Sequence, residues 1–114
     1  MENNLRHLDS AFHALADPTR RAVIARLTAG AAPVKTLAEP FDMGLPSFLK
    51  HLRVLEDSGL ILTEKSGRTR TCRLCASRLA ETERWIANQR QLWEDHADRL
   101  ANYIENQMSG EDTQ

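Results

Sequence analysis

The segment LPSFLKHLRVLEDSGLI, residues 45–61, places small polar and basic side chains at helical spacing. Its leucines at 45, 49, 52 and 55 follow one another at intervals of four, three and three residues, which predicts a helix with one buried stripe. The opposite face then carries Ser47, Lys50, His51 and Val54. This face lacks the Glu–Lys pairs of an ordinary solvated helix. Its hydroxyl, ammonium and imidazole groups can donate hydrogen bonds, so the pattern indicates a surface that meets a partner.

A basic segment follows this helix. Residues 65–78 contain five Lys and Arg residues and no acid. Residues 1–80 hold twelve basic against eight acidic residues, whereas residues 81–114 hold three against eight, so the net charge of −1 hides an asymmetry. A basic segment on a protein with an acidic remainder predicts a surface for a polyanion, with a solvated basic loop as the alternative.

Two cysteines form a C-x-x-C pair, Cys72 and Cys75, which raises a redox or zinc interpretation. A zinc ribbon needs a second pair, and a thioredoxin-like motif opens a helix after a strand, so the usual context is missing. Cys72 falls in an expected strand, where residues three apart point to opposite faces. We therefore expect Cys72 to pack inside a hairpin. A redox-active pair, or a disulfide between two copies, stays open because thiols beside arginines such as Arg73 can be reactive.

The length and composition of the chain indicate which class of protein carries these groups. The chain has 114 residues with 41% hydrophobic and 27% charged content, which predicts one soluble globular domain. No apolar run approaches the roughly 18 residues of a membrane span, and the polar N-terminus does not resemble a signal peptide, so we expect a cytoplasmic protein with no membrane partner. Phosphate-binding glycine loops and catalytic triads are missing from the sequence, which predicts that the protein is not an enzyme.

The chain reads mainly as helices. Apolar spacing predicts a first helix over residues 5–16, and Asp17 and Pro18 are typical of the cap and first position of a second helix that Gly30 ends. Pro33 and Pro40 confine a short third helix, and the fourth runs from Leu45 to Asp57 before Ser58-Gly59. Alternation then predicts a β-hairpin with a turn at Ser66-Gly67, followed by one long helix over residues 77–106 and a disordered tail over 109–114.

This order of elements predicts a mainly α fold with a β-hairpin wing, that is, a winged helix-turn-helix. Residues 34–58 form the helix-turn-helix and residues 60–75 the wing. A helix of this kind fits the DNA major groove, and a basic hairpin tip fits the backbone or the adjacent minor groove, so the expected partner is double-stranded DNA. The predicted DNA-binding residues are Lys35, Thr36, Pro46, Ser47, Lys50, His51, Arg53, Val54, Lys65, Arg68, Thr69 and Arg70.

Three segments, ALADPTRRAVIARL, LAEPFDMGLPSFLKHLRVLEDSGLI and GRTRTCRL, resemble the ArsR/SmtB family of bacterial winged-helix transcription regulators over roughly residues 8–105. The resemblance implies a homodimeric repressor whose fourth helix enters the major groove of an inverted-repeat operator. From the chain length we expect one domain over residues 1–108, and the apolar stripe of the last helix predicts pairing with a second copy. The resemblance likewise implies that helices 1–16 and 77–106 form the dimer interface. The predicted interface residues are Leu5, Leu8, Phe12, Trp85, Leu92, Trp93, His96, Leu100, Tyr103 and Ile104.

The sequence departs from the family pattern at two positions in or next to the fourth helix, which is the recognition helix of the family. Leu49 stands where many members have a serine, and Gly44 stands where many have a capping serine. We expect Leu49 to pack in the core. The operator sequence therefore does not carry over from other members.

Metal sensing is the sharpest alternative. Family metal sensors use cysteines in the third helix or Asp, His and Glu residues on the last one. The third helix here has neither Cys nor His, and Glu94, Asp95 and His96 are consecutive and so diverge around a helix. We expect no metal cofactor. The remaining metal candidates are His7, His13 and His96, and any small effector is unknown.

Two alternatives to a simple repressor stay open. One is a metal- or thiol-responsive sensor on the same scaffold. The other is a winged-helix module for protein contacts, which predicts that DNA affinity lacks steep salt dependence.

Overall fold

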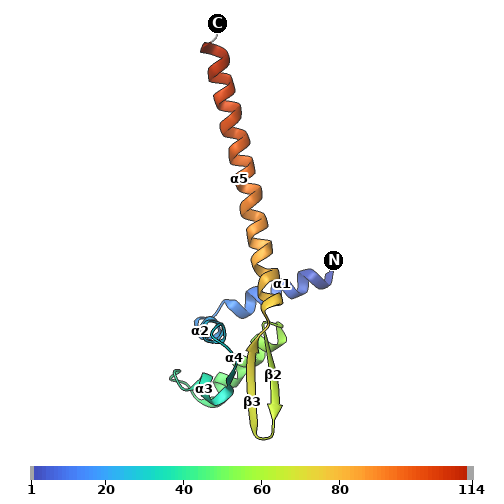
Figure 1. Ribbon diagram of the computed structural model, residues 1–114, viewed down its shortest axis with the longest axis vertical. Coiled ribbons are helices and arrows are strands. Elements are labelled where there is room, and N and C mark those ends of the chain that lie inside the picture. The colour runs from blue at the N-terminus through green and yellow to red at the C-terminus, as the bar shows by residue number, and fades with distance from the viewer. Residues whose placement is uncertain (1, 113–114) are drawn as a thin grey trace. The chain divides into compact units, whose positions relative to one another are not determined.

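The computed structural model describes residues 2–112 of the chain, with side chains described for residues 7–110. The chain divides into two compact units, residues 1–82 and residues 83–114, and the expected single domain over 1–108 stays a prediction. The elements shown in Figure 1 are α1 (Glu2–Leu15), α2 (Pro18–Leu27), β1 (Ala32–Pro33), α3 (Val34–Ala38), α4 (Leu45–Asp57), β2 (Ile61–Ser66), β3 (Thr69–Leu74) and α5 (Ala76–Asp112). All of them except the greater part of α5 belong to the first unit.

Helix α2 begins as its sequence predicts. Asp17 is the N-cap, and its Oδ2 accepts a hydrogen bond of 3.0 Å from the backbone N–H of Arg20, while Pro18 occupies the first helical position. The helix ends at Leu27 with Thr28 as its cap, so the prediction that Gly30 ends it is wrong. Gly30 instead has φ +135° and lies in the connection to β1, where its missing side chain allows that conformation.

Helix α4 has the predicted bounds and a glycine end. Gly59 has φ +80°, and the backbone N–H groups of Gly59 and Leu60 donate to the carbonyls of Glu56 and Leu55 at 3.0 and 3.2 Å. These two bonds form a Schellman motif, which satisfies the last carbonyls of the helix. A side chain at Gly59 would also meet the Arg78 side chain, because a Cβ there would lie 2.9 Å from Nε.

The buried face of α4 differs from the prediction. Phe48, Leu52 and Leu55 are buried, whereas Leu45 and Leu49 are 53% and 38% exposed, so the expected core positions of these two leucines are wrong. The Phe48 ring lies 5.3 Å from the ring of Phe41, which the tight turn between α3 and α4 brings against it. Because an aromatic side chain buries more apolar surface than a leucine, the helix turns Phe48 inward and Leu49 outward.

A three-stranded antiparallel sheet completes the first unit, with strand order β1-β3-β2. The two-residue strand β1, which the sequence pattern did not predict, pairs Ala32 with Cys72. The hairpin turn lies at Gly67-Arg68, one residue later than predicted, because Ser66 pairs with Thr69 and Gly67 supplies the positive φ of +63°. The core of this unit consists of Ala11, Ala14, Val23, Ile24, Leu27, Ala32, Leu37, Phe48, Leu52, Leu55, Leu60, Ile61 and Cys72.

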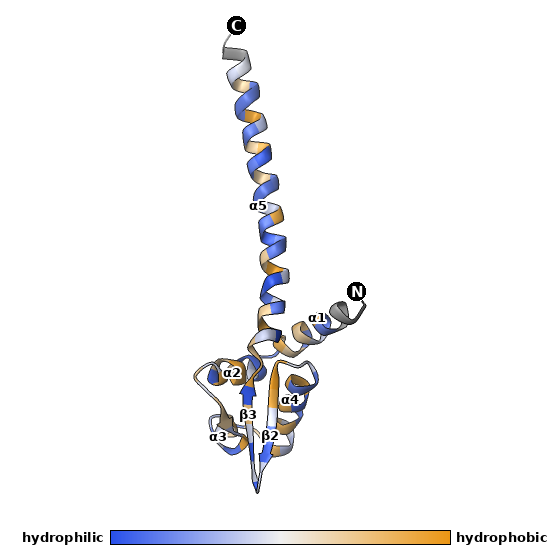
Figure 2. Ribbon diagram, turned by 45° about the vertical axis from the view of Figure 1, so that its right-hand side comes forward, coloured by the Kyte–Doolittle hydropathy of each residue, from blue (hydrophilic) through white to orange (hydrophobic). Residues whose placement is uncertain are grey.

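Helix α5 is longer than predicted. It continues to Asp112, so residues 109–112 are helical and the expectation of a disordered tail is wrong for them, while residues 113 and 114 lie outside the described part. Figure 2 shows hydrophobic positions recurring among hydrophilic ones along this helix. Within residues 2–112, no helix is both long and apolar enough to cross a membrane.

We expect Phe48→Ala to lower the free energy of unfolding by about 3–5 kcal/mol, since it removes a buried ring and leaves a cavity. Leu49→Ala is the matched control, and because Leu49 is partly exposed it should cost less than about 1 kcal/mol. Urea denaturation followed by circular dichroism measures both. Equal losses of unfolding free energy in the two variants would contradict the burial of Phe48 and the exposure of Leu49.

Candidate nucleic-acid interface

The outward face of α4 presents a row of side chains at helical spacing. Pro46, Lys50 and Arg53 follow one another at intervals of four and three residues and are all exposed, and Asp57 ends the row. Leu49 adds an exposed apolar side chain beside them. Two cations on a helix whose other face is anchored in a core form a surface that can enter a groove and meet acceptors.

The structure does not place all the predicted α4 residues on this face. Ser47 is exposed at its edge, but Val54 is half-buried and packs against the core. His51 is also half-buried, on the flank of the helix toward α2. The observed outward face therefore differs from the predicted one by a rotation about the helix axis of less than the roughly 100° between successive residues. The reason is that Phe48, and not Leu49, lies in the core. On α3, Lys35 and Thr36 are exposed.

The wing carries cations on the sheet face that meets the helices. Lys65 and Arg70 are register partners, so their side chains share a face with the pair Thr63 and Cys72. Cys72 is buried, and the Thr63 hydroxyl donates a hydrogen bond of 2.9 Å to Oε1 of Glu56 on α4, so this face is the one toward α4. Lys65 and Arg70 are thus cations on the same side as the recognition helix.

Charge balance differs between the two faces of the wing. On the outer face, Arg73 pairs with Glu64 at 3.6 Å. Lys65 and Arg70 instead lie opposite one another, and like charges in directly opposed positions destabilise a strand pair. A polyanion bound at the tip would relieve this repulsion. The exposed Arg68 and Thr69 lie in and beside the turn, so they extend the same basic tip.

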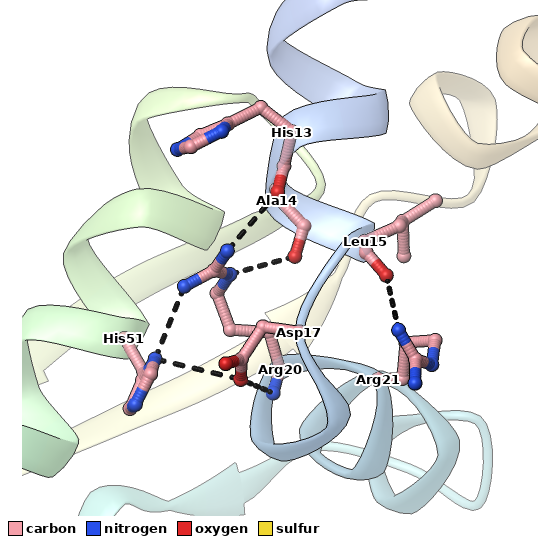
Figure 3. A network of polar contacts seen from close by, with 7 residues as sticks. All are labelled: His13, Ala14, Leu15, Asp17, Arg20, Arg21 and His51. Carbon is pink, nitrogen blue, oxygen red and sulfur yellow. Dashed lines mark hydrogen bonds and ion pairs between the residues drawn. The ribbon is translucent and has the colours of Figure 1, made fainter.

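A polar network links α4 to α2 through two residues that the sequence analysis did not assign to the site. The Nη1 of Arg20 lies 3.2 Å from Nδ1 of His51, and Oδ2 of Asp17 lies 3.7 Å from the same nitrogen (Figure 3). The hydrogen bond from the backbone N–H of Arg20 is the main reason that the pKa of Asp17 is lowered from its usual 3.8, so Asp17 is a carboxylate at neutral pH. No local pattern reveals this contact, because Arg20 and His51 are 31 residues apart.

The two thiols have different environments. Cys72 is fully buried in β3, as expected, and burial raises the pKa of its thiol. Cys75 follows β3 and is partly exposed, and the Ser77 hydroxyl, 3.5 Å from Sγ, is the main cause that lowers the pKa of Cys75. Both cysteines are free. Thiol chemistry at neutral pH therefore favours Cys75.

The metal candidates form no ligand cluster in the described part of the chain. His7 and His13 are exposed on α1, and His96 lies on α5 with its ring 6.2 Å from the ring of Trp93. Within the described residues, no group of three or more His, Cys, Asp and Glu side chains is arranged to hold a metal ion.

The predicted interface residues of α5 are exposed apolar side chains. Trp85, Leu92, Trp93, Leu100, Tyr103 and Ile104 are between 47% and 68% exposed. On α1, Leu8 and Phe12 are half-buried, and the side chain of Leu5 lies outside the described ones.

Comparisons with known proteins agree with this geometry. Residues 15–64 match a family model described as a helix-turn-helix domain. The HTH-type transcriptional regulator Rv2034 of Mycobacterium tuberculosis is 38% identical over 72 residues, which cover 63% of this chain and 67% of that protein. The transcriptional repressor SdpR of Bacillus subtilis is 28% identical over 81 residues, 71% of this chain and 90% of the repressor. A crystal structure of an ArsR family transcriptional regulator is similar with a TM-score of 0.74 and 56% identity, over 77% of this chain and 97% of that one.

We expect a thiol reagent such as Ellman's to modify Cys75 rapidly in the folded protein and to reach Cys72 only after unfolding. The reason is that Cys75 is partly exposed with a lowered pKa, whereas Cys72 is buried with a raised one. The absorbance that develops with and without denaturant measures how many thiols react and how fast. Cys75→Ser should lose the fast reaction and Cys72→Ser should keep it, and the reverse pattern would refute the assignment.

Proposed function

The chain belongs to the ArsR family of transcriptional regulators, and from this premise we propose that it is a homodimeric repressor that binds an inverted-repeat operator through α4 and the wing. Members of this family are DNA-binding regulators and not enzymes. The observation that carries the proposal is the position of Lys65 and Arg70, which are exposed register partners on the wing face toward α4. The protein would act in the cytoplasm on double-stranded DNA.

Each part of the surface has a distinct task in this proposal. Lys50 and Arg53 project from the outward face of α4 into the major groove, where they donate to guanine O6 and N7 or to phosphates. Lys35 and Thr36 on α3 contact the backbone and set the register of the recognition helix. The wing cations lie along the phosphates of the next stretch of duplex or in its minor groove.

The second copy is inferred from α5. Ile86, Trp93 and Leu100 are seven residues apart, and Tyr103 and Ile104 continue the stripe, which is the spacing of a helix pair. These side chains are half or more exposed, and a water-facing apolar stripe of this length favours association with an identical helix. A twofold dimer would present two α4 helices, and these match the two half-sites of an inverted repeat.

One observation favours a thiol-responsive variant of this function. Cys75 is partly exposed with a lowered pKa, and it joins the wing to α5. Modification of this thiol would disturb the connection between the proposed DNA-binding and dimerising elements. Release of operator DNA by oxidant in the wild type, and not in Cys75→Ser, would support this variant.

We expect Lys50→Ala and Arg70→Ala to weaken binding to DNA from the gene's own upstream region. If Lys50 contacts a base, specific binding should fall by about 1–3 kcal/mol, whereas loss of a phosphate contact at Arg70 should lower the salt slope by about 1. Arg73→Ala is the matched wing control, since Arg73 is paired with Glu64 on the outer face. Fluorescence anisotropy at several salt concentrations, with scrambled DNA for comparison, gives these values. Salt-independent binding, or no binding, would instead favour the protein-contact module.

We expect Trp93→Ala to weaken dimerisation by about 2 kcal/mol or more, since large aromatic residues dominate the energy of interfaces. Sedimentation equilibrium measures the dissociation constant. Asn102→Ala, which lies off the apolar stripe, is the control and should leave it unchanged. A Trp93→Ala protein as dimeric as the wild type would remove α5 from the proposed interface.

A further inference from the structure

Arg20 lies outside the helix-turn-helix, yet its guanidinium contacts the recognition helix. Its Nε donates to the Ala14 carbonyl at 2.7 Å and its Nη2 to the His13 carbonyl at 3.0 Å, both at the end of α1. Its Nη1 is directed at Nδ1 of His51 at 3.2 Å (Figure 3). Because three nitrogens of one planar group are held at once, the guanidinium has a defined position and aims one N–H at the imidazole.

This contact determines which ring nitrogen of His51 carries the proton. Arginine only donates hydrogen bonds, so Nδ1 has to accept, and the proton of the neutral ring is then on Nε2. The carboxylate of Asp17 would favour the opposite tautomer, but its Oδ2 is 3.7 Å from Nδ1, beyond a normal hydrogen bond. Arg20 is nearer, so the geometry favours the tautomer with the proton on Nε2.

The remaining nitrogen of His51 is available to a ligand. Figure 3 shows this ring nitrogen pointing away from Arg20 and Asp17, and within the described residues it has no hydrogen-bond partner. Every buried side-chain nitrogen or oxygen in the described part of the chain does have one, so Nε2 reaches solvent. The side chain as a whole is 23% exposed, which leaves an N–H donor at the surface of an otherwise anchored ring.

We propose that Arg20 is a positioning residue that holds His51 as the Nε2–H tautomer, so that α4 presents a neutral N–H donor to a phosphate oxygen of the bound DNA. This inference rests on the proposed function. A phosphate is the acceptor because His51 lies on the flank of α4 toward α2, away from the outward row of Lys50 and Arg53 that faces the groove. In helix-turn-helix complexes the backbone passes along such flanks, while the outward face meets the bases.

A long-range proton–nitrogen NMR spectrum of the free protein at pH 8, where an ordinary imidazole is neutral, tests the tautomer without DNA. We expect a bare Nδ1 and a protonated Nε2 for His51. In Arg20→Lys, whose single ammonium cannot reproduce the three bonds, the preference should weaken or reverse. A protonated Nδ1 in the wild type would overturn the proposal.

Two amide variants separate the two nitrogens in the DNA assay. His51→Gln places an amide near the position of Nε2 and keeps the outward donor, whereas His51→Asn keeps only a partner for Arg20. We expect affinity to fall about tenfold or more in His51→Asn, equally for operator and scrambled DNA, and to fall less in His51→Gln. His13→Asn on α1 is the matched control and should bind like the wild type. Thermal unfolding confirms that each variant is folded.

The salt dependence shows whether the donor is neutral. A neutral N–H releases no counterion, so the salt slope of His51→Asn should equal that of the wild type, whereas Lys50→Ala lowers the slope if Lys50 contacts a phosphate. A lower slope in His51→Asn would mean that His51 binds as a cation, and loss confined to the operator would mean that it contacts a base. Either result, or a stronger loss in His51→Gln than in His51→Asn, overturns the proposal. Failure of the wild type to bind any DNA would instead refute the proposed function, and the NMR result would then report the tautomer alone.

Discussion

The contacts of the Arg20 guanidinium are the interaction that links α1, α2 and α4 in the first unit. Helix α1 ends with carbonyls that have no partner within the helix, and Arg20 satisfies those of His13 and Ala14 while its own backbone N–H bonds to the Asp17 cap of α2. The same group then reaches His51 on α4. A lysine has no planar fork and could not make these contacts together. One side chain thus contacts three helices, one of which carries the proposed groove-binding face.

The distribution of charge explains why the proposed DNA surface is confined to one side. Most exposed ion pairs contribute little to stability, and the pair of Arg73 with Glu64 serves mainly to neutralise the outer face of the wing. On the other face Lys65 and Arg70 are register partners, and like charges in opposed positions disfavour a strand pair, so a bound polyanion would stabilise this part of the wing. The hydrogen bond from Thr63 to Glu56 connects this part of the wing to α4. The wing and the recognition helix are therefore linked by a short-range contact.

Features that depend on neighbours within a few residues were predictable. The Asp17 cap, the bounds of α4 and its end at Gly59 each rest on local hydrogen bonds or on a positive φ, and the structure confirms them. The phase of the α4 stripe was not predictable in the same way, because Phe48 and Leu49 are adjacent and either could have begun an apolar face. The contact between Phe48 and Phe41 across the turn decided it. Strand β1 was missed because two residues show no alternation, and its pairing with β3 depends on residues about forty positions away.

The sequence by itself determined the helices and the hairpin, their order and the sign of the charge at the wing, since helix caps, turn glycines and charged residues act through their own chemistry and that of near neighbours. It also contained the segments that identify the family. Only the tertiary structure decided which flank of α4 is anchored and which is presented. His51 is an exposed candidate in a helical projection, but folding brings Arg20, 31 residues earlier, against its Nδ1 and leaves Nε2 toward solvent. Such a choice between two nitrogens of one ring depends on a contact of 3.2 Å between Nη1 of Arg20 and Nδ1 of His51, which no local pattern encodes.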